Sequence, residues 1–324
     1  MVLALILSAA MLLVQHFALF SDASIIPNAT GNYSQIRVVQ PPPNLALRSA
    51  SALVQDQETG ECLLQKQANL ILPIASITKL MTAMVVLDAE MNLQESLTIT
   101  SEDVDIIRNS RSKLPVNTSI TRGNALLLAL MASDNRAAHA LGRIYPGGTG
   151  AFVEAMNAKA RSLGLAETHF DDPTGLSSGN TSTARDLARM VDAAYHYRLI
   201  RESTTCKEAT IRLGHRTRQF HNTNQLIRNP RWQIGLSKTG FIDEAGRCLV
   251  MQLQVAKRPV LIVLLDAQGK LTRYGDANRI KQWMEGSPDY SAPNRPLIPF
   301  QIGHPFWSKS AGYSGTNQAA HLRS

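Results

Sequence analysis

Three short strings in this 324-residue chain carry side chains that could together transfer an acyl group: Ser76-Ile-Thr-Lys79, Ser133-Asp-Asn135 and Lys238-Thr-Gly240. A serine hydroxyl is a poor nucleophile at neutral pH unless a nearby base takes its proton. A lysine amine can serve as that base when burial and another cation lower its pKa. The strings therefore predict an acyl-transfer enzyme that has no Ser-His-Asp triad.

The first string opens a strongly helical stretch, residues 76–90, in which apolar side chains recur at every third or fourth position. Ser76, at the start of this helix, would lie beside free backbone N–H groups and the positive end of the helix dipole, which favour a developing oxyanion. Lys79 follows at i+3 and would project from the same face. The non-functional alternative is an N-cap serine with an exposed lysine.

The second and third strings also have non-functional alternatives. Ser133-Asp-Asn135 falls between two helical stretches, where a turn would expose Ser133 and Asn135, but all three residues are also good helix caps. Lys238-Thr-Gly240 lies on a predicted strand, where the lysine and threonine can hold a carboxylate and the glycine lets another backbone approach. Alone, this string is better explained by an edge-strand lysine that blocks aggregation. The order and context of the three strings favour a site.

Rival copies of these patterns occur in less suitable contexts. Ser110-Arg-Ser-Lys113 repeats the first pattern in a polar, non-periodic stretch, and Ser178-Gly-Asn180 repeats the second in a loop, which positions groups less well than a rigid helix end. Gly175-Leu-Ser-Ser-Gly179 matches a nucleophile elbow, but the residues before it are too polar for the required strand. The eight histidines show no metal-ligand spacing, so we expect neither a metal ion nor another cofactor.

The elements that must position these strings indicate an α+β fold. Residues 50–54 and 61–64 predict a hairpin, and a mostly helical middle follows, with an apolar run at 126–131 and helical periodicity at 135–143, 150–163 and 182–196. Residues 234–241, 247–255 and 260–265 predict three strands with short connections, which makes them antiparallel, before a closing helix at 277–285. We therefore expect an antiparallel β-sheet built from both chain ends, flanked by helices, with a helical subdomain.

Composition and the N-terminus indicate an exported protein. The formal charge of +8 suits an anionic environment, and the absence of a Lys/Arg run with interleaved aromatics argues against nucleic acid as a partner. Residues 2–20 are almost wholly apolar and precede small residues, which predicts a signal peptide over residues 1–23. No Lys or Arg precedes that stretch, so a membrane contact through an uncleaved N-terminal segment stays open.

Cys62, Cys206 and Cys248 show no CxxC spacing, which argues against a disulfide framework or zinc site and leaves one bridge open.

In this order, the three strings resemble those of low-molecular-mass penicillin-binding proteins of the serine DD-peptidase family. The resemblance covers about residues 47–285 and includes Pro73-Ile-Ala-Ser-Ile-Thr-Lys-Leu-Met-Thr-Ala83, Thr168-His-Phe-Asp-Asp-Pro-Thr-Gly-Leu176, Ser182-Thr-Ala-Arg-Asp186 and Lys238-Thr-Gly-Phe241. Leu126-Leu-Leu-Ala-Leu-Met-Ala-Ser-Asp-Asn-Arg-Ala137 and Tyr145-Pro-Gly-Gly148 are most similar to the D-alanyl-D-alanine endopeptidase branch, which cleaves peptide cross-links in peptidoglycan. The resemblance implies a β-lactamase/DD-peptidase-like fold and a periplasmic enzyme that acts on peptidoglycan peptide stems and is acylated by β-lactams.

The same resemblance implies a role for each site residue. Ser76 would attack the carbonyl of a D-alanine, Lys79 would act as general base, and Ser133 would relay a proton to the leaving amine. The residues implied for substrate binding are Asn135, Lys238, Thr239, Gly240 and Phe241, with Asn135 on the substrate amide and Lys238 and Thr239 on a carboxylate. The oxyanion would rest between the N–H groups of Ser76 and Phe241.

The predicted layout is a signal peptide (1–23), a linker (24–46), a serine DD-peptidase domain (47–285) and a Pro-rich, irregular tail (286–324). This tail is too short and Pro-rich for the additional β-rich domain and anchor helix of some carboxypeptidase relatives. No Glu-x-x-Leu-Asn string follows the second motif, which disfavours a class A β-lactamase. A D-alanyl-D-alanine carboxypeptidase remains the nearest alternative. A non-catalytic wall-binding protein is the alternative of another class, and the intact set of reactive side chains argues against it.

Overall fold

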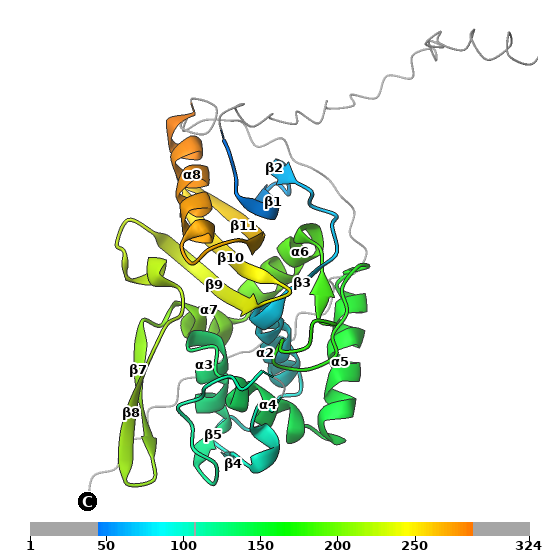
Figure 1. Cartoon of the computed structure of the whole chain (residues 1–324), viewed down its shortest axis with the longest axis vertical. Helices are drawn as coiled ribbons and strands as arrows, with labels where there is room; N and C mark the ends of the chain where they lie inside the picture. Colours follow the sequence, from blue (N-terminus) through cyan, green and yellow to red (C-terminus); the bar gives the residue numbers. More distant parts are fainter. Residues whose placement is uncertain (1–44, 107, 288–324) are drawn as a thin grey trace, which may run out of the picture. The chain divides into compact units, whose positions relative to one another are not determined.

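Both ends of the described chain contribute strands to one five-stranded antiparallel sheet in the computed structural model, which describes residues 45–106 and 108–287 (Figure 1). The strand order is β2-β1-β11-β10-β9. The strands are β1 (Ser49–Asp56), β2 (Cys62–Lys66), β9 (Gln233–Ile242), β10 (Gly246–Val255) and β11 (Arg258–Ala267). The predicted hairpin and the three predicted C-terminal strands are thus confirmed, and β9, which carries Lys238, is an edge strand of this sheet.

Alternating side chains of the sheet enter two separate cores. On one face, Val54, Met251 and Ile262 pack with residues of α8 (Thr272–Gly286), among them Ile280. On the other face, Leu53, Val250 and Val263 join a larger core that includes α6 (Ala184–Tyr195). The period-two alternation of a strand with two buried faces explains why these strands are apolar on both sides.

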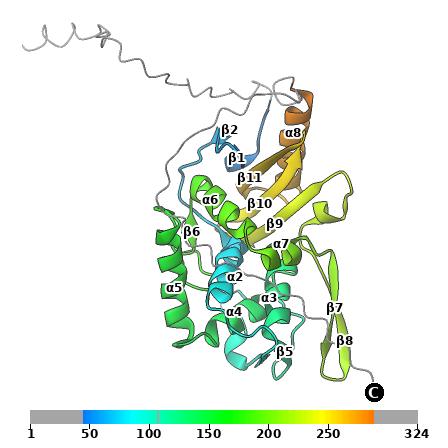
Figure 2. The same cartoon turned by 180° about the vertical axis from the view of Figure 1, so that it is seen from behind.

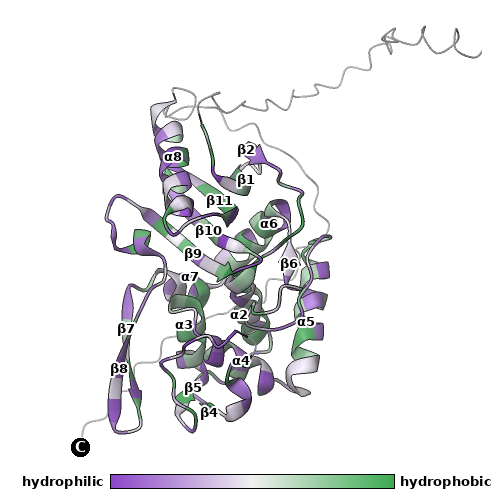
Figure 3. Ribbon diagram, in the orientation of Figure 1, coloured by the Kyte–Doolittle hydropathy of each residue, from purple (hydrophilic) through white to green (hydrophobic). Residues whose placement is uncertain are grey.

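A group of helices contributes much of the larger core (Figure 2). Its members are α2 (Lys79–Asp88), α3 (Arg122–Met131), α4 (Asn135–Arg143), α5 (Gly148–Ser162) and α7 (Arg198–Thr205). Every residue of α2 from Lys79 to Val86 is buried, and this helix packs against α3, α4, α5 and α6. A helix that is buried around its circumference belongs in the centre of a core, and Figure 3 shows α2 as mostly hydrophobic.

The α+β prediction is confirmed, and five predicted helical regions match α2, α4, α5, α6 and α8. The sequence analysis missed α7, the hairpin of β7 (Glu208–Leu213) and β8 (Arg216–His221), and the short pair β4 (Ser96–Thr98) and β5 (Ser119–Thr121). In β8 only Phe220 is buried, so the strand has no polar–apolar alternation to detect. Figure 3 shows this hairpin as a mostly hydrophilic projection.

Smaller elements complete the described chain: β3 (Leu72–Pro73), η1 (Ala75–Thr78), η2 (Ser101–Asp103), β6 (Thr181–Ser182) and η3 (Gln225–Arg228). The predicted signal peptide, linker and tail lie outside the described residues, apart from residues 45–46 and 286–287, and stay predictions. Within the described ranges, no helix is both long and apolar enough to cross a membrane.

Candidate active site

The first motif forms a hydroxyl–amine pair at the junction of η1 and α2. Lys79 Nζ lies 2.8 Å from Ser76 Oγ, so the predicted i, i+3 contact on one helix face is present. The same nitrogen donates to Asn135 Oδ1 at 2.7 Å and to the Thr174 carbonyl at 2.6 Å. Ser76 is half-buried and Lys79 is fully buried, which leaves the hydroxyl as the accessible member of the pair.

Burial lowers the pKa of Lys79 to about 7, and the nearby carboxylates of Asp172 and Asp134 oppose this shift. At neutral pH, a large fraction of the amine is therefore unprotonated. A neutral amine has two N–H groups, enough for the Asn135 and Thr174 oxygens, and one lone pair that can accept the proton of Ser76. The arrangement can activate a serine without a histidine.

The second motif forms the turn between α3 and α4. Ser133 has a φ of +56°, a left-handed conformation that is uncommon for a residue with a Cβ and that directs its hydroxyl toward strand β9. Asp134 caps α4, because its carboxylate accepts a hydrogen bond from Ala137 N at 3.0 Å. The capping and functional interpretations of this motif are therefore compatible: the capped turn holds Ser133 and Asn135 on either side of Asp134.

The third motif meets the second through Lys238, whose Nζ donates to Ser133 Oγ at 2.8 Å and to the Thr239 carbonyl at 3.0 Å. Although β9 is an edge strand, Lys238 is only 1% exposed, because η1 packs along this part of the strand. Burial and the positive charges of Lys79 and Arg273 lower its pKa well below the ordinary value. Among the described residues, no carboxylate pairs with Lys238. An anion bound from outside the protein would stabilise the protonated form of Lys238, so this side chain can receive one.

Gly240 lets the backbone of Ile74 and Ser76 approach strand β9 closely, as the glycine in the third motif predicts. A Cβ at this position would lie 2.9 Å from the Ile74 carbonyl oxygen and 3.2 Å from Ser76 N. The Gly240 carbonyl accepts a hydrogen bond from Arg273 Nη1 at 3.0 Å. Strand β9 can therefore pass directly beside the backbone of the predicted nucleophile.

The remaining predicted residues lie on either side of Gly240 in β9. Thr239 Oγ1 is hydrogen-bonded to Thr223 Oγ1 at 2.6 Å. Phe241 is 49% exposed, with the Arg247 guanidinium 4.3 Å from its ring centroid. The structure thus brings all eight predicted residues to one place, with five of them in two hydrogen-bonded groups: Ser76, Lys79 and Asn135, and Ser133 with Lys238.

The sequence analysis missed the contribution of the loop between α5 and β6. Besides the Thr174 carbonyl, this loop provides Gly175, which has a φ of +81° and whose added Cβ would lie only 2.0 Å from the Ala75 carbonyl oxygen. Asp172 Oδ1 accepts hydrogen bonds from the backbone of Thr174 and Gly175 and stabilises the turn. The Asp-Asp-Pro-Thr-Gly turn sequence was the available signal, but it predicts a turn without indicating what the turn contacts.

Two rejected strings also contribute. Ser110, from the rival copy of the first motif, accepts a hydrogen bond at 2.7 Å from Asn135 Nδ2 and so orients the amide that contacts Lys79. Asn180, from the rival copy of the second motif, is fully buried and accepts hydrogen bonds from the backbone N–H groups of Asp171 and Asp172. Both residues support the site from outside its reacting groups.

The family model described as D-alanyl-D-alanine carboxypeptidase, of peptidase family S11, matches residues 36–269, which is more than half of the chain. The chain belongs to this family. It is therefore a serine-type DD-peptidase, a hydrolase of the kind that the three motifs predict.

Curated relatives and solved structures agree with this assignment. The DD-peptidase is 49% identical over 253 residues to the D-alanyl-D-alanine endopeptidase of Pseudomonas aeruginosa, covering 76% of this chain and 82% of that protein. It is 46% identical over 241 residues to the protein of the same name from Escherichia coli K12, covering 74% and 78%. The Streptomyces K15 DD-transpeptidase matches with a TM-score of 0.69 at 28% identity, over 74% of this chain and 97% of that one. The predicted fold type is confirmed.

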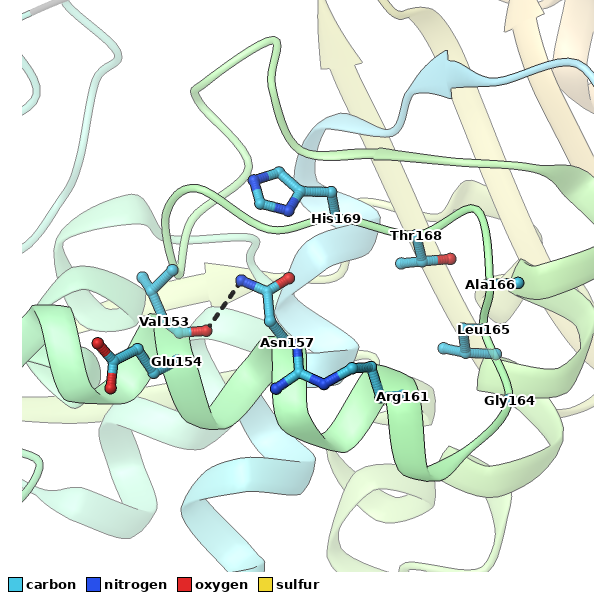
Figure 4. A pocket seen from close by; sticks show the side chains of 9 residues that line it. All are labelled: Val153, Glu154, Asn157, Arg161, Gly164, Leu165, Ala166, Thr168 and His169. Atoms are coloured by element: carbon cyan, nitrogen blue, oxygen red, sulfur yellow. Dashed lines mark hydrogen bonds between the residues drawn. The ribbon is translucent and has the colours of Figure 1, made fainter.

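A separate surface pocket of about 670 Å³ lies beside α5 (Figure 4). None of its lining residues is a predicted site residue of the DD-peptidase. Asn157 in its wall donates to the Val153 carbonyl and to the Phe170 carbonyl, and its Oδ1 accepts from Phe170 N. These bonds anchor the segment that leads into the loop at 171–180, so Asn157 has a structural role there.

The described residues contain no group of three or more His, Cys, Asp or Glu side chains arranged to hold a metal ion. Cys62, Cys206 and Cys248 are free thiols. Cys248 is fully buried, and burial raises its pKa to about 11, so it has little thiolate character at neutral pH.

Proposed function

We propose that this DD-peptidase is a D-alanyl-D-alanine endopeptidase that cleaves D-alanyl peptide cross-links in peptidoglycan through an acyl-enzyme at Ser76. Two relatives, at 49% and 46% identity, carry the name endopeptidase, whereas two relatives at 31% identity are named carboxypeptidases. The observation that carries the catalytic part is the 2.8 Å contact between Ser76 Oγ and a buried amine with a pKa of about 7.

In the acylation step, neutral Lys79 accepts the proton of Ser76 as Oγ bonds to the D-alanyl carbonyl carbon. The oxyanion formed in this step is bound by the backbone N–H groups of Ser76 and Phe241. The close approach of Gly240 to Ser76 N supports a shared site for these two groups. The carbon–nitrogen bond then breaks as Ser133 donates its hydroxyl proton to the leaving amine and takes up the proton that Lys79 removed from Ser76, so that both side chains return to their starting states.

Substrate binding falls to Asn135, Lys238 and Thr239. Lys238, which has no carboxylate partner among the described residues, binds a carboxylate of the leaving part of the substrate together with Thr239. Asn135 holds the substrate amide, and its position between Lys79 and Ser110 supports a fixed orientation. Water then hydrolyses the ester of Ser76 and releases the D-alanyl carboxylate. β-Lactams would form the same ester and release it slowly.

The remaining parts of the proposal concern the setting of the enzyme. A signal peptide at residues 1–23 would export it to the periplasm, where peptidoglycan peptide stems are its substrates. A linker (24–46) would precede the catalytic domain (47–285), and a Pro-rich tail (286–324) would follow. The names of the relatives, which are wall-peptide hydrolases, support this setting.

Two measurements test the proposal. Fluorescent penicillin should label the wild-type protein covalently and fail to label Ser76→Ala, with an identical melting temperature as the control for folding. Purified cross-linked muropeptide dimers should then be cut to monomers. Release of terminal D-alanine without loss of dimers would make the enzyme a carboxypeptidase, and label that survives Ser76→Ala would remove Ser76 as the nucleophile.

A further inference from the structure

One ion pair joins three separate segments at the rim of the site. Arg108, in the segment between η2 and β5, places Nη2 2.8 Å from Glu244 Oε1, and Glu244 belongs to the turn between β9 and β10. The Nε of the same guanidinium donates to the Leu176 carbonyl at 2.7 Å. A single side chain thus links the helical part of the molecule, the loop at 171–180 and the sheet.

The position of this pair relative to Ser76 follows from the course of β9. Gly240 marks the point where the strand passes beside Ser76 N. Lys238 precedes that point in the strand, whereas Glu244 follows it, beyond the end of β9 at Ile242. On the other side of the site, Leu176 directly follows Gly175, which packs on the Ala75 carbonyl. Arg108 therefore lies beside the nucleophile in the direction away from Lys238.

This direction determines which part of the substrate meets Arg108, given the proposed function. If Lys238 binds the leaving part, the scissile carbonyl lies at Ser76 and the acyl donor extends toward the β9–β10 turn. The residue that precedes the reacting D-alanine then lies nearest to Arg108 and Glu244. A guanidinium at that place offers paired N–H donors that match the geometry of a carboxylate.

The ion pair itself is weak enough to be exchanged. The Arg108 and Glu244 side chains are 22% and 48% exposed, and ion pairs exposed to this degree contribute little to stability. An incoming carboxylate can therefore replace Glu244 on Arg108, against the remaining negative charges of Asp243 and Asp105, while the bond from Nε to the Leu176 carbonyl keeps the guanidinium in place.

We propose that Arg108 is the centre of a carboxylate-binding subsite for the acyl donor, with Glu244 as its resident competitor. The substrate class is a peptide whose residue before the reacting D-alanine carries an anionic side chain. The subsite rests on the proposed function, because the direction of the substrate depends on the role of Lys238.

The test uses two peptides, acetyl-glutamyl-D-alanyl-D-alanine and its glutaminyl isostere, with the full-length protein. D-Alanine release gives kcat/KM, and competition against fluorescent penicillin gives the affinity of each peptide even where turnover is slow. We expect the wild type to favour the glutamyl peptide by about tenfold, in line with one charge-assisted hydrogen bond. Arg108→Gln should abolish this preference, and Glu244→Gln should increase it, since the competing carboxylate is gone.

The matched control is Arg198→Gln, which breaks another exposed Arg–Glu pair, with Glu202 on α7, and should leave the preference unchanged. Penicillin labelling of every variant reports the integrity of Ser76 independently of the subsite. A wild type that binds both peptides equally, or a Glu244→Gln variant with no increase, would overturn the subsite. Absence of Ser76-dependent labelling in the wild type would overturn the proposed function instead.

Discussion

Lys79 and Lys238 are two buried lysines that each contact a serine hydroxyl at 2.8 Å, yet their surroundings are opposite. Lys79 is surrounded by acceptors, the Asn135 amide and the Thr174 carbonyl, with the carboxylates of Asp172 and Asp134 nearby. Lys238 donates to Ser133 and to its own strand, and the groups that act on its pKa, Arg273 and the protonated form of Lys79, both lower it.

The difference indicates a proton-transfer role for Lys79 and a substrate-binding role for Lys238. The protein itself supplies the groups that balance Lys79, and the pKa of about 7 suits a side chain that gains and loses a proton in each cycle. The protein leaves Lys238 without a counter-ion among the described residues, so a bound carboxylate would supply the missing charge. We therefore expect substitution of Lys79 to affect chemistry with every substrate, and substitution of Lys238 to affect mainly substrates that carry a carboxylate.

The largest expected effect is that of Lys79→Ala on acylation. Loss of a general base costs about 10²- to 10⁴-fold in rate, so the second-order rate constant for penicillin acylation should fall by that factor. The rate constant of Lys79→Arg should fall equally, because arginine keeps the charge but does not release its proton near neutral pH. Stopped-flow measurement of labelling checks both variants. An arginine variant with near wild-type acylation would contradict the role of base.

A smaller and selective effect is expected for Lys238→Ala. The lost charge-assisted hydrogen bond should slow acylation by benzylpenicillin by about ten- to a hundredfold. The methyl ester of benzylpenicillin has no carboxylate, so its acylation rate should change little. The ratio of the two rates in wild type and variant is the measurement. If Lys238→Ala slows acylation by both compounds equally, Lys238 does not act through the substrate carboxylate, and the proposed difference between the two lysines is wrong.

The sequence could predict the reacting side chains because their placement depends on local geometry. Ser76 and Lys79 lie one helical turn apart, and Ser133 and Asn135 flank a helix cap, so spacing alone brings each pair together. The sheet was predictable for a similar reason, since β9, β10 and β11 are apolar runs with short connections. Lys238 met Ser133 only through the tertiary fold, and here the family resemblance supplied what periodicity did not.

The supporting contacts could not be predicted in the same way. The Thr174 carbonyl is backbone, which every residue has, so no residue type marks its role. Ser110 was rejected because its segment is polar and non-periodic, yet a polar segment without regular structure can still reach Asn135 across the fold. Strand β8 lacks alternation because most of its side chains are exposed. These features depend on which segments meet in space, a long-range property that local patterns do not carry.

Two glycines test how the backbone around each lysine is held. Gly175→Ala combines a φ of +81° with a Cβ 2.0 Å from the Ala75 carbonyl, so the loop that supplies the Thr174 carbonyl to Lys79 must move. We expect a loss of stability of at least about 2 kcal/mol from overpacking and left-handed strain. Gly240→Ala, on the strand of Lys238, meets its neighbour at 2.9 Å without a left-handed φ and should cost less. Thermal unfolding of both variants checks which substitution costs more stability. A Gly175→Ala variant that is more stable than Gly240→Ala would contradict the prediction.

The smallest expected effect is a shift in pH dependence. Because the neutral amine of Lys79 is the base, the acylation rate should fall tenfold per pH unit below its pKa of about 7 and level off above it. The Asp134 carboxylate raises this pKa, so Asp134→Asn should move the midpoint to lower pH, while asparagine still caps α4. Asp88→Asn, which removes a carboxylate that pairs with Lys159, is the matched control and should leave the midpoint in place. If the midpoint rises in Asp134→Asn, or if Asp88→Asn moves it equally, the fall in acylation rate at low pH reports the titration of a group other than Lys79.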